Sequence, residues 1–460
     1  MRLKSALRRG VAAAVIAGIV VSSGIPAYAG TWDIADGDIT VKGASDESGN
    51  YNNVKQGEKD FEKDEGETVI TGESDKNTVT IDTSKGDVDV TFDDLKIDVS
   101  GKKEGNGSDD GPVDAGKAAV TVQGDHDATI ELDGDNELKS GAGHAGLEHN
   151  KTDTSGELTI QDKDNNGSLE AAGGFKGAGI GSAGSNDAQV KITGGNITAT
   201  SDDWGAGIGS GSYGTGTVEI TGGEINATGG YLGAGIGGGC NGSGNVTISG
   251  GTITAAGSDG AAGIGGGYYN GATVTITGDA VIKNASSTKY GAGIGGGNGS
   301  DGNVTISGNA KIENATGGYG AAGIGGGAFS SPDKIGNGNV VIKDNAKIDN
   351  VQGGAYGAGI GGGIYGLSNV TIEGNTKVNA TGGAGGAAIG GGAGAENNSD
   401  NNGNQITIKS NENGSPTINA VGGGTDEGEK IVIGGAGIGA GCESVADADI
   451  TLEGKVTITA

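Results

Sequence analysis

The segment Gly233-Ala234-Gly235-Ile236-Gly237-Gly238-Gly239 decides the fold, because close variants of it recur along the whole chain. Nine copies are present, and their central isoleucines are Ile180, Ile208, Ile236, Ile264, Ile294, Ile324, Ile360, Ile389 and Ile438. Consecutive isoleucines are 28, 28, 28, 30, 30, 36, 29 and 49 residues apart. Self-similarity at such a period is the signature of a repeat architecture. Each copy is therefore expected to form one structural unit.

Each unit contains two further β-type segments after the glycine-rich strand, which we call strand A. Strand B is a triplet such as Val246-Thr247-Ile248, and strand C follows a glycine turn, as in Ile253-Thr254-Ala255. The longer gaps come from insertions at turns, for example at 328–338 and 396–404. Three short strands cannot bury an apolar face alone. Stacked units can, because each strand then pairs with its copies about 4.8 Å above and below.

The sequence therefore predicts an all-β protein, a right-handed single-stranded parallel β-helix with about three short strands per coil and about a dozen coils. The handedness follows from the chirality of strand crossovers. Strand alternation places three residue pairs inward in a typical coil: Ala234 and Ile236, Val246 and Ile248, Ile253 and Ala255. Three degenerate coils are expected before the clear copies, built on Leu147, Ile160 and Leu169, on Val122, Leu132 and Leu138, and on Ile81, Phe92 and Ile97.

The stacking geometry also predicts the state of the two cysteines. Cys240 and Cys442 both lie four residues after a strand A isoleucine, six coils apart. Six coils correspond to about 29 Å at the strand spacing, whereas a disulfide requires Cα atoms within about 7 Å. Two unpaired thiols are expected.

Composition excludes other fold classes. The 460 residues include 104 Gly and only 4 Pro, and Gly costs about 1 kcal/mol per helical position relative to Ala, which argues against a helical domain. Collagen needs Gly at every third position with abundant Pro. Calcium-binding nonapeptide rolls need an Asp in each glycine turn, and residues 233–239 contain no carboxylate.

Residues 1–29 resemble a secretory signal. Arg2, Lys4, Arg8 and Arg9 precede an apolar run, and Ala27-Tyr28-Ala29 is a small-x-small cleavage site. The run is too short for a comfortable membrane span, and no transmembrane segment is expected elsewhere. The domains predicted are the signal peptide at 1–29, an acidic segment with irregular first coils at 30–115, and the glycine-rich β-helix at 116–460. The expected location is extracellular, either free or associated with the cell surface.

Charge restricts the partners. Acidic residues outnumber basic ones 58 to 29, a net charge of −29, and removing four basic signal residues makes it −33. Residues 30–460 contain no arginine. Nucleic acid is excluded as a partner, because phosphate binding needs a basic face.

Catalysis is not expected. Parallel β-helices include polysaccharide lyases and hydrolases, which need a base beside acidic metal ligands or a pair of carboxylates. Here all three histidines, His126, His144 and His149, lie in the degenerate coils, and acidic pairs such as Asp202-Asp203 suit solvated turns. No nucleophile has an evident base. The chain is predicted to be neither an enzyme nor a metalloprotein.

One segment leaves calcium binding open as an alternative. Asp162-Lys163-Asp164-Asn165-Asn166-Gly167 has oxygen donors at positions 1, 3 and 5 and Gly at position 6, as in an EF-hand loop. The acid expected at position 12 falls on Gly173. A lengthened polar turn between strands B and C is the favoured interpretation, so no cofactor is assigned.

Aromatic residues give the clearest functional signal, since 11 of the 16 in the chain flank strand A. Stacking would turn them into two columns beside a face whose outward positions, such as Gly205, Gly207 and Gly209, are bare glycine. A flat floor with aromatic rims suits a polysaccharide; alternatively, the rings stack on one another and cap the turns. Tyr268 and Phe329 belong to the eleven, and the nine predicted binding residues are Phe175, Trp204, Tyr213, Tyr231, Tyr269, Tyr290, Tyr319, Tyr356 and Tyr365.

The outward positions of strand B offer a rival surface. Thr247, Thr275, Thr305, Thr371 and Thr407 would form a hydroxyl column of the kind found in ice-binding solenoids. Lys191, Glu219 and Val341 interrupt it, and Thr is simply a good strand residue. Ice binding is the weaker interpretation.

With its Gly-Ala-Gly-Ile-Gly-Gly-Gly coils, preceded by Gly143-His144-Ala145-Gly146-Leu147-Glu148-His149, the chain resembles secreted glycine-rich β-helix proteins of Gram-positive bacteria, described as carbohydrate-binding-domain-containing surface proteins. The resemblance covers the chain from about Thr31 onward. It implies a right-handed β-helix similar to that of pectate lyases, without the lyase site. Many relatives carry a wall-sorting signal that this sequence lacks, so the mode of anchoring stays open.

The function predicted is a secreted, non-catalytic protein that binds a polysaccharide or cell-wall glycan along the aromatic-flanked glycine face. The alternative is a structural or adhesive surface rod without a glycan ligand, for which self-association stays open. A polysaccharide lyase or hydrolase is the third and least favoured hypothesis.

Overall fold

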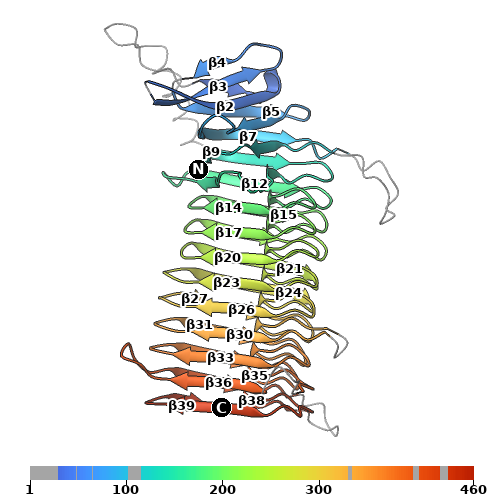
Figure 1. Ribbon diagram of the computed structural model, residues 1–460, viewed down its shortest axis with the longest axis vertical. Coiled ribbons are helices and arrows are strands. Elements are labelled where there is room, and N and C mark those ends of the chain that lie inside the picture. The colour runs from blue at the N-terminus through green and yellow to red at the C-terminus, as the bar shows by residue number, and fades with distance from the viewer. Residues whose placement is uncertain are drawn as a thin grey trace, which may run out of the picture.

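A computed structural model describes residues 30–47, 49–64, 66–101, 116–329, 334–396, 403–424 and 434–460. The predicted signal peptide at 1–29 lies outside these ranges. The described residues form a long rod of stacked coils, with the N-terminal strands at one end and the C-terminal coil at the other (Figure 1). None of the helical structure in these ranges is long and apolar enough to cross a membrane. The fold is the predicted right-handed parallel β-helix.

Three classes of strand recur from residue 158 onward. The A strands are β13 (Ile180–Gly181), β16 (Ile208–Gly209), β19 (Ile236–Gly237), β22 (Ile264–Gly265), β25 (Ile294–Gly295), β29 (Ile324–Gly325), β32 (Ile360–Gly361), β35 (Ile389–Gly390) and β38 (Ile438–Gly439). The B strands are β11 (Leu158–Gln161), β14 (Ala188–Ile192), β17 (Gly216–Ile220), β20 (Gly244–Ile248), β23 (Ala272–Ile276), β26 (Gly302–Ile306), β30 (Gly338–Ile342), β33 (Ser368–Glu373), β36 (Asn404–Lys409) and β39 (Ala448–Glu453). The C strands are β12 (Gly167–Gly173), β15 (Asn196–Ser201), β18 (Glu224–Thr228), β21 (Thr252–Asp259), β24 (Val281–Lys289), β27 (Lys311–Ile312), β28 (Ala315–Thr316), β31 (Lys347–Gln352), β34 (Lys377–Thr381), β37 (Thr417–Val421) and β40 (Thr457–Thr459).

Identical positions of successive coils pair directly. Each strand A isoleucine from Ile180 to Ile389 faces that of the next coil in a parallel ladder, which ends at Ile438. The A strands belong to one sheet of 15 strands, and the B and C strands to another of 25 among the described residues. The predicted stacking in register is confirmed.

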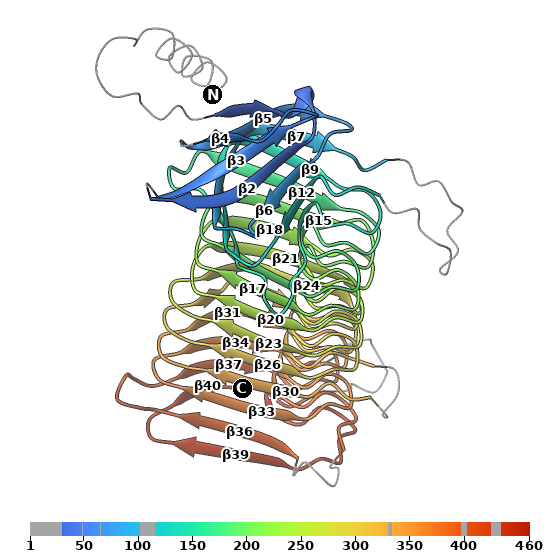
Figure 2. The same ribbon diagram turned by 45° about the horizontal axis from the view of Figure 1, so that its top comes forward.

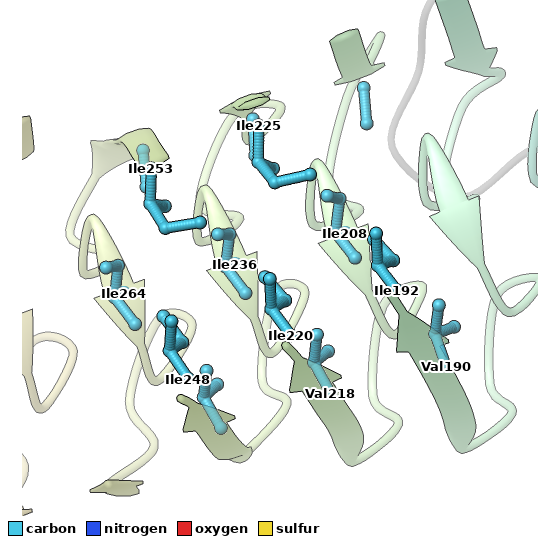
Figure 3. Packing of buried hydrophobic residues seen from close by; sticks show 14 of the residues in the cluster. Val190, Ile192, Ile208, Val218, Ile220, Ile225, Ile236, Ile248, Ile253 and Ile264 are labelled. Atoms are coloured by element: carbon cyan, nitrogen blue, oxygen red, sulfur yellow. The ribbon is translucent and has the colours of Figure 1, made fainter. Parts of the chain in front are cut away.

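Side chains of these ladders fill the interior of the rod. Figure 3 shows Ile208, Ile236 and Ile264 in one line, with the isoleucines of strands B and C in parallel lines beside it. The predicted inward pairs Ala234 and Ile236, Val246 and Ile248, and Ile253 and Ala255 are all buried. Each fully buried isoleucine or valine contributes about 1.5–3 kcal/mol relative to exposure, so every coil adds its own share of the core.

The early coils are present but irregular. Their elements are β1 (Thr31–Asp33), the short 3₁₀ helix η1 (Ile34–Asp36), β2 (Ile39–Asp46), β3 (Gly49–Gln56), β4 (Glu62–Asp64), β5 (Thr68–Ser74), β6 (Val79–Asp82), β7 (Val88–Asp98), β8 (Val120–Gln123), β9 (Ala128–Lys139) and β10 (Leu147–His149). Strands β2, β3 and β4 pair antiparallel and lie at the N-terminal end of the rod (Figure 2). They differ from every later coil in this respect.

The register implied between the Val122 and Leu147 coils was wrong by two residues, whereas Val122 pairs with Ile81, Leu132 with Phe92 and Leu138 with Ile97 as expected. Leu147 pairs with Val120 rather than Val122, and Ile160 pairs with Ile130 rather than Leu132. A shift of two residues keeps the same side chains pointing inward, because strand side chains alternate with a period of two. The apolar pattern alone therefore could not distinguish the two registers.

Glycine is required where backbones meet at close range. At Gly235, a Cβ atom would lie 2.7 Å from the amide nitrogen of Ala256 and 2.7 Å from the carbonyl oxygen of Gly263. The first atom belongs to strand C of the same coil and the second to the next coil, and neither backbone can move without breaking a ladder. This crowding explains the glycine before the strand A isoleucine.

The two cysteines are both free, as predicted.

We expect Gly235→Ala to lower the free energy of unfolding by about 1–3 kcal/mol, the usual cost of overpacking. Urea titration followed by circular dichroism measures the loss. Gly434→Ala is the matched control, since a Cβ atom there would meet nothing within 4 Å. Equal stability of the two variants would contradict the close-approach argument.

Candidate functional site

A tight turn lies on each side of strand A. The leading turn precedes the strand and is closed, in the Ile236 coil, by a 2.9 Å hydrogen bond from the Gly233 N–H to the Gly230 carbonyl. The trailing turn follows the strand and is closed by a 2.8 Å bond from the Gly242 N–H to the Gly239 carbonyl. Such a turn bends the chain back within four residues.

The two rows of turns are joined along the rod. The residue four places after the isoleucine donates its N–H to the carbonyl four places before the isoleucine of the preceding coil. Cys240 donates to Trp204 at 2.6 Å, Tyr268 to Leu232 at 3.1 Å, and Ala328 to Tyr290 at 2.6 Å. The leading and trailing turns therefore meet on one edge of the rod. We call this edge, from the coil of Ile180 to that of Ile360, the aromatic seam.

The predicted glycine floor between two aromatic rims was wrong. Gly205, Gly207 and Gly209 are buried rather than bare. A Cβ atom on Gly207 would lie 2.7 Å from the Thr228 amide nitrogen and 2.7 Å from the Gly235 carbonyl oxygen. The end of strand C and the next coil occupy the space that the sequence pattern leaves open, because the turns fold over strand A and bond to each other.

All nine predicted aromatic residues lie on the seam. Phe175, Trp204, Tyr231, Tyr290, Tyr319 and Tyr356 belong to leading turns, and Tyr213, Tyr269 and Tyr365 to trailing turns. Tyr213, Tyr231, Tyr319 and Tyr269 are 58%, 53%, 53% and 36% exposed, and the other five are half-buried. Rings therefore reach the surface along much of the seam.

Neighbouring rings touch in short runs. Phe175 and Trp204 have ring centroids 5.4 Å apart, and the Lys176 ammonium lies 5.1 and 5.0 Å from them. Tyr290 and Tyr319 are 6.1 Å apart, and Tyr319 and Tyr356 are 5.8 Å apart, both edge to face. Such pairs are worth about 0.5–1.5 kcal/mol beyond their buried area, so stacking between rings explains part of the seam.

Ring stacking does not explain where the rings are attached. Six of them sit on residues with left-handed backbone: φ is 62°, 58° and 74° at the leading-turn residues Trp204, Tyr290 and Tyr356, and 66°, 61° and 63° at the trailing-turn residues Tyr213, Tyr269 and Tyr365. Other coils have glycine at the same positions, namely Gly260, Gly320, Gly385, Gly299 and Gly394, or non-aromatic residues that share the positive φ, namely Lys176, Leu232, Ser185, Asn241 and Glu443. A left-handed backbone costs a non-glycine residue about 1–2 kcal/mol. At these six positions the chain has bulky aromatic residues, although glycine would adopt the same left-handed backbone without strain.

Tyr268 belongs to the seam although it was not among the nine predicted residues. The leading turn of its coil has no aromatic residue, but a Cβ atom on Gly260 would collide with the Tyr268 ring, so this ring covers the vacant place. Its hydroxyl donates to the Tyr269 hydroxyl at 2.9 Å. The adjacent tyrosines Tyr268 and Tyr269 were the sequence feature that could have indicated this role. The role becomes clear only from the hydrogen bonds that join the leading and trailing turns.

A second concave region lies at the N-terminal coils. A cleft of about 880 Å³ opens between β3 and the outer faces of β7, β9 and β11, lined by acids that include Glu131, Asp133 and Asp164. Burial, followed by the charge of Asp164, raises the pKa of Asp133. Oxygens of Glu131, Asp162 and Asp164 lie within 4.8 Å of one another. Sequence reasoning missed Glu131, which comes from the coil before the 162–167 segment.

Protein groups already bind most of these oxygens. The two carboxylate oxygens of Asp162 accept the Asn166 and Gly167 amides, each at 3.1 Å. Lys163 donates its amide to Glu131 Oε1 at 2.6 Å, with its ammonium 3.7 Å from Oε2. The segment forms the lengthened polar turn between β11 and β12 that was favoured. The absence of a bound metal stays a prediction.

The histidines and the buried cysteine have structural surroundings. His144 Nδ1 lies 2.7 Å from Glu148 Oε2, and this hydrogen bond raises the pKa of His144. Burial lowers the pKa of His149, whose Nδ1 contacts the Gln189 carbonyl at 3.1 Å. Burial also raises the pKa of the Cys240 thiol to about 11, which leaves it a poor nucleophile at neutral pH.

Fold and seam together define a parallel β-helix solenoid with an aromatic edge. A family model described as a beta helix repeat matches residues 190–212, 218–240, 246–268 and 304–328. Each of the first three matches begins in a strand B and continues through strand C. It ends in the trailing turn of the strand A that follows. No curated protein and no solved structure matches the chain. The comparisons thus support a β-helix repeat protein and leave the ligand to be inferred from the seam.

The strain argument predicts that glycine is preferred over alanine at Tyr213, which is 58% exposed. Tyr213→Gly should be more stable than Tyr213→Ala by about 1 kcal/mol, because alanine keeps the unfavourable left-handed backbone. Thermal unfolding of the two variants measures the difference. Equal stability would show that the turn holds this residue without strain.

The His144–Glu148 pair predicts a pH-dependent stability. Because the pKa of His144 is raised in the folded state, the pair stabilises the fold fully below the ordinary histidine value and loses this effect as the pH rises through the raised value. His144→Gln should therefore cost more stability at about pH 5.5 than at about pH 8.5. Glu148→Gln should remove the same component. A pH-independent difference in urea midpoints would contradict the assignment.

Proposed function

We propose that this protein is a secreted, non-catalytic carbohydrate-binding solenoid that holds a polysaccharide on the aromatic seam. The observation that carries the proposal is the line of nine aromatic residues on one edge, six of them at positive-φ turn positions that other coils fill with glycine or with non-aromatic residues. Strain that persists at particular residues points to function rather than to folding convenience. Of the six strained residues, Tyr213 and Tyr269 are exposed and the other four are half-buried along the same edge.

Exposure supports the same conclusion. Monomeric proteins seldom expose a run of large apolar groups unless it binds something. Tyr213, Tyr231 and Tyr319 are each more than half exposed. They belong to the Ile208, Ile236 and Ile324 coils and lie on the same edge of the rod. Aromatic faces with hydroxyl tips suit sugar rings, which present both C–H faces and hydroxyl groups.

Charge favours a neutral glycan. The chain carries −29 overall, or −33 without the four basic residues of the predicted signal. Such a charge repels a polyanion at long range. The seam has only a few cations, among them Lys176 near Phe175 and Trp204 and Lys334 at 4.0 Å from the Tyr269 ring. A neutral polysaccharide or cell-wall glycan is therefore the ligand class proposed.

A structural rod is the second candidate, and the contacts between rings favour it. Tyr319 packs edge to face on Tyr290 and Tyr356, with ring centroids 6.1 and 5.8 Å apart, and such pairs stabilise the turns that carry them. In this case the rings serve as caps, and no glycan binds.

The proposal includes the absence of catalysis. If the acidic cleft acted as a hydrolase or lyase site, incubation with xylan, mannan or polygalacturonate would release reducing or unsaturated ends, and Asp133→Asn would abolish the release. No product is expected from the wild-type chain, and product formation would replace binding by an enzymatic function.

We expect Tyr231→Ala and Tyr319→Ala each to weaken binding of the glycan that a neutral-polysaccharide array identifies, by about tenfold, as for an aromatic hot spot. Titration calorimetry measures the dissociation constants, and circular dichroism confirms folding. Tyr51→Ala is the matched control, because Tyr51 lies in β3 under the Lys63 ammonium, outside the seam. Unchanged binding by the seam variants, or no binding by the wild type, would favour the structural rod.

A further inference from the structure

From the Ile180 coil to the Ile324 coil, the aromatic residues of the trailing turns alternate with a period of two coils. In trailing turns, Tyr213, Tyr269 and Phe329 belong to the Ile208, Ile264 and Ile324 coils, and the coils between them carry Asn241 and Gly299 at the same place. Tyr269 and Phe329 bridge the intervening Gly299, with ring centroids 5.7 Å apart. Aromatic side chains thus recur in every second coil of this row up to Ile324, and Tyr365 in the next coil ends the alternation.

The leading turns show the same alternation in another form. Tyr290 and Tyr356 lie four residues before their isoleucines, and Tyr319, in the coil between them, lies five before. The one-residue shift turns the middle ring nearly at right angles to both neighbours, at 90° and 75°. Phe175, Trp204 and Tyr231, in the first three coils of the seam, alternate in the opposite order and lie five, four and five residues before their isoleucines.

These periods define lengths along the rod. One coil rises about 4.8 Å, so two coils rise about 9.6 Å. The neighbouring rings of the leading row are 5.4–6.1 Å apart. One coil is thus about the length of one pyranose unit in an extended, equatorially linked chain. Two coils match the disaccharide repeat of such a chain, whose successive sugar rings are flipped.

From this match we propose that the ligand is an extended, equatorially 1,4-linked neutral glycan that lies parallel to the rod axis, one sugar unit per coil. The inference rests on the proposed function and specifies its geometry. From the Ile180 coil to the Ile360 coil the seam covers six intervals, or about 29 Å, which is room for about six sugar units. A helical 1,3-linked glycan changes direction too quickly to follow the edge.

The test is the dependence of affinity on chain length. Neutral β-1,4-linked oligosaccharides of glucose, mannose, xylose and N-acetylglucosamine with about two to six units are titrated, with β-1,3-linked glucose oligomers of equal length as matched ligands. For the best β-1,4 series, the dissociation constant should fall about tenfold for each two units added, through the longest chain. The β-1,3 series should stop improving earlier.

The outcomes separate the two proposals. Affinity that stops rising at about three units, or that is equal for both linkages, would overturn the axial alignment and leave carbohydrate binding intact. Binding of no oligosaccharide and no polymer would overturn carbohydrate binding and the alignment together. Tyr356→Ala should reduce the gain in affinity from the longest chains, whereas Tyr51→Ala should not change it.

Discussion

The structure depends on one constraint, the hydrogen-bonded ladder that holds each coil in register on the next. Because parallel strands stack about 4.8 Å apart, any residue that recurs in the repeat becomes a line along the rod. Isoleucines of strand A form the line that fills the interior, and turn residues form the lines that meet at the seam. A shift of one residue would reverse which side chains face inward. Core and candidate site are thus fixed by the same pairing.

Glycine acts here mainly through the backbone approach that it permits. The sequence pattern suggests an open glycine surface, but Gly207 and Gly235 are covered by backbone of strand C and of the next coil. Because glycine has no side chain, the turns can close over strand A. They join each other through hydrogen bonds such as that from the Cys240 N–H to the Trp204 carbonyl. The result is an edge with two backbone layers, in which the outer layer carries the rings. The abundance of glycine therefore builds the support of the seam and not its contact surface.

Most of the fold follows from the repeat, whereas the contacts between turns do not. Spacing and alternation were sufficient to predict the ladder partners of Ile236 and the inward residues of strands B and C. The register between the Val122 and Leu147 coils was not predicted, because a shift of two residues leaves the apolar pattern unchanged, as at Leu147 and Val120. The position of Tyr268 over Gly260, and of Glu131 beside Asp162, was also not predicted. Both contacts join residues of different turns or coils. How closely these residues approach depends on the backbone path, which the periodicity of the sequence does not determine.

Within the molecule, neighbouring coils act as controls for one another. The Ile360 coil holds Tyr356 and Tyr365 at its two left-handed positions, and the Ile389 coil holds Gly385 and Gly394 at the same two. Their strands A pair directly, so both side-chain types are compatible with the ladder. Glycine is the unstrained choice, yet the Ile180 coil also replaces it at both positions, by Lys176 and Ser185, which have the same positive φ. The ladder therefore fixes the conformation of the turns and leaves their side chains free to vary, so the rings of the seam are set by the choice of residue and not by a demand of the backbone.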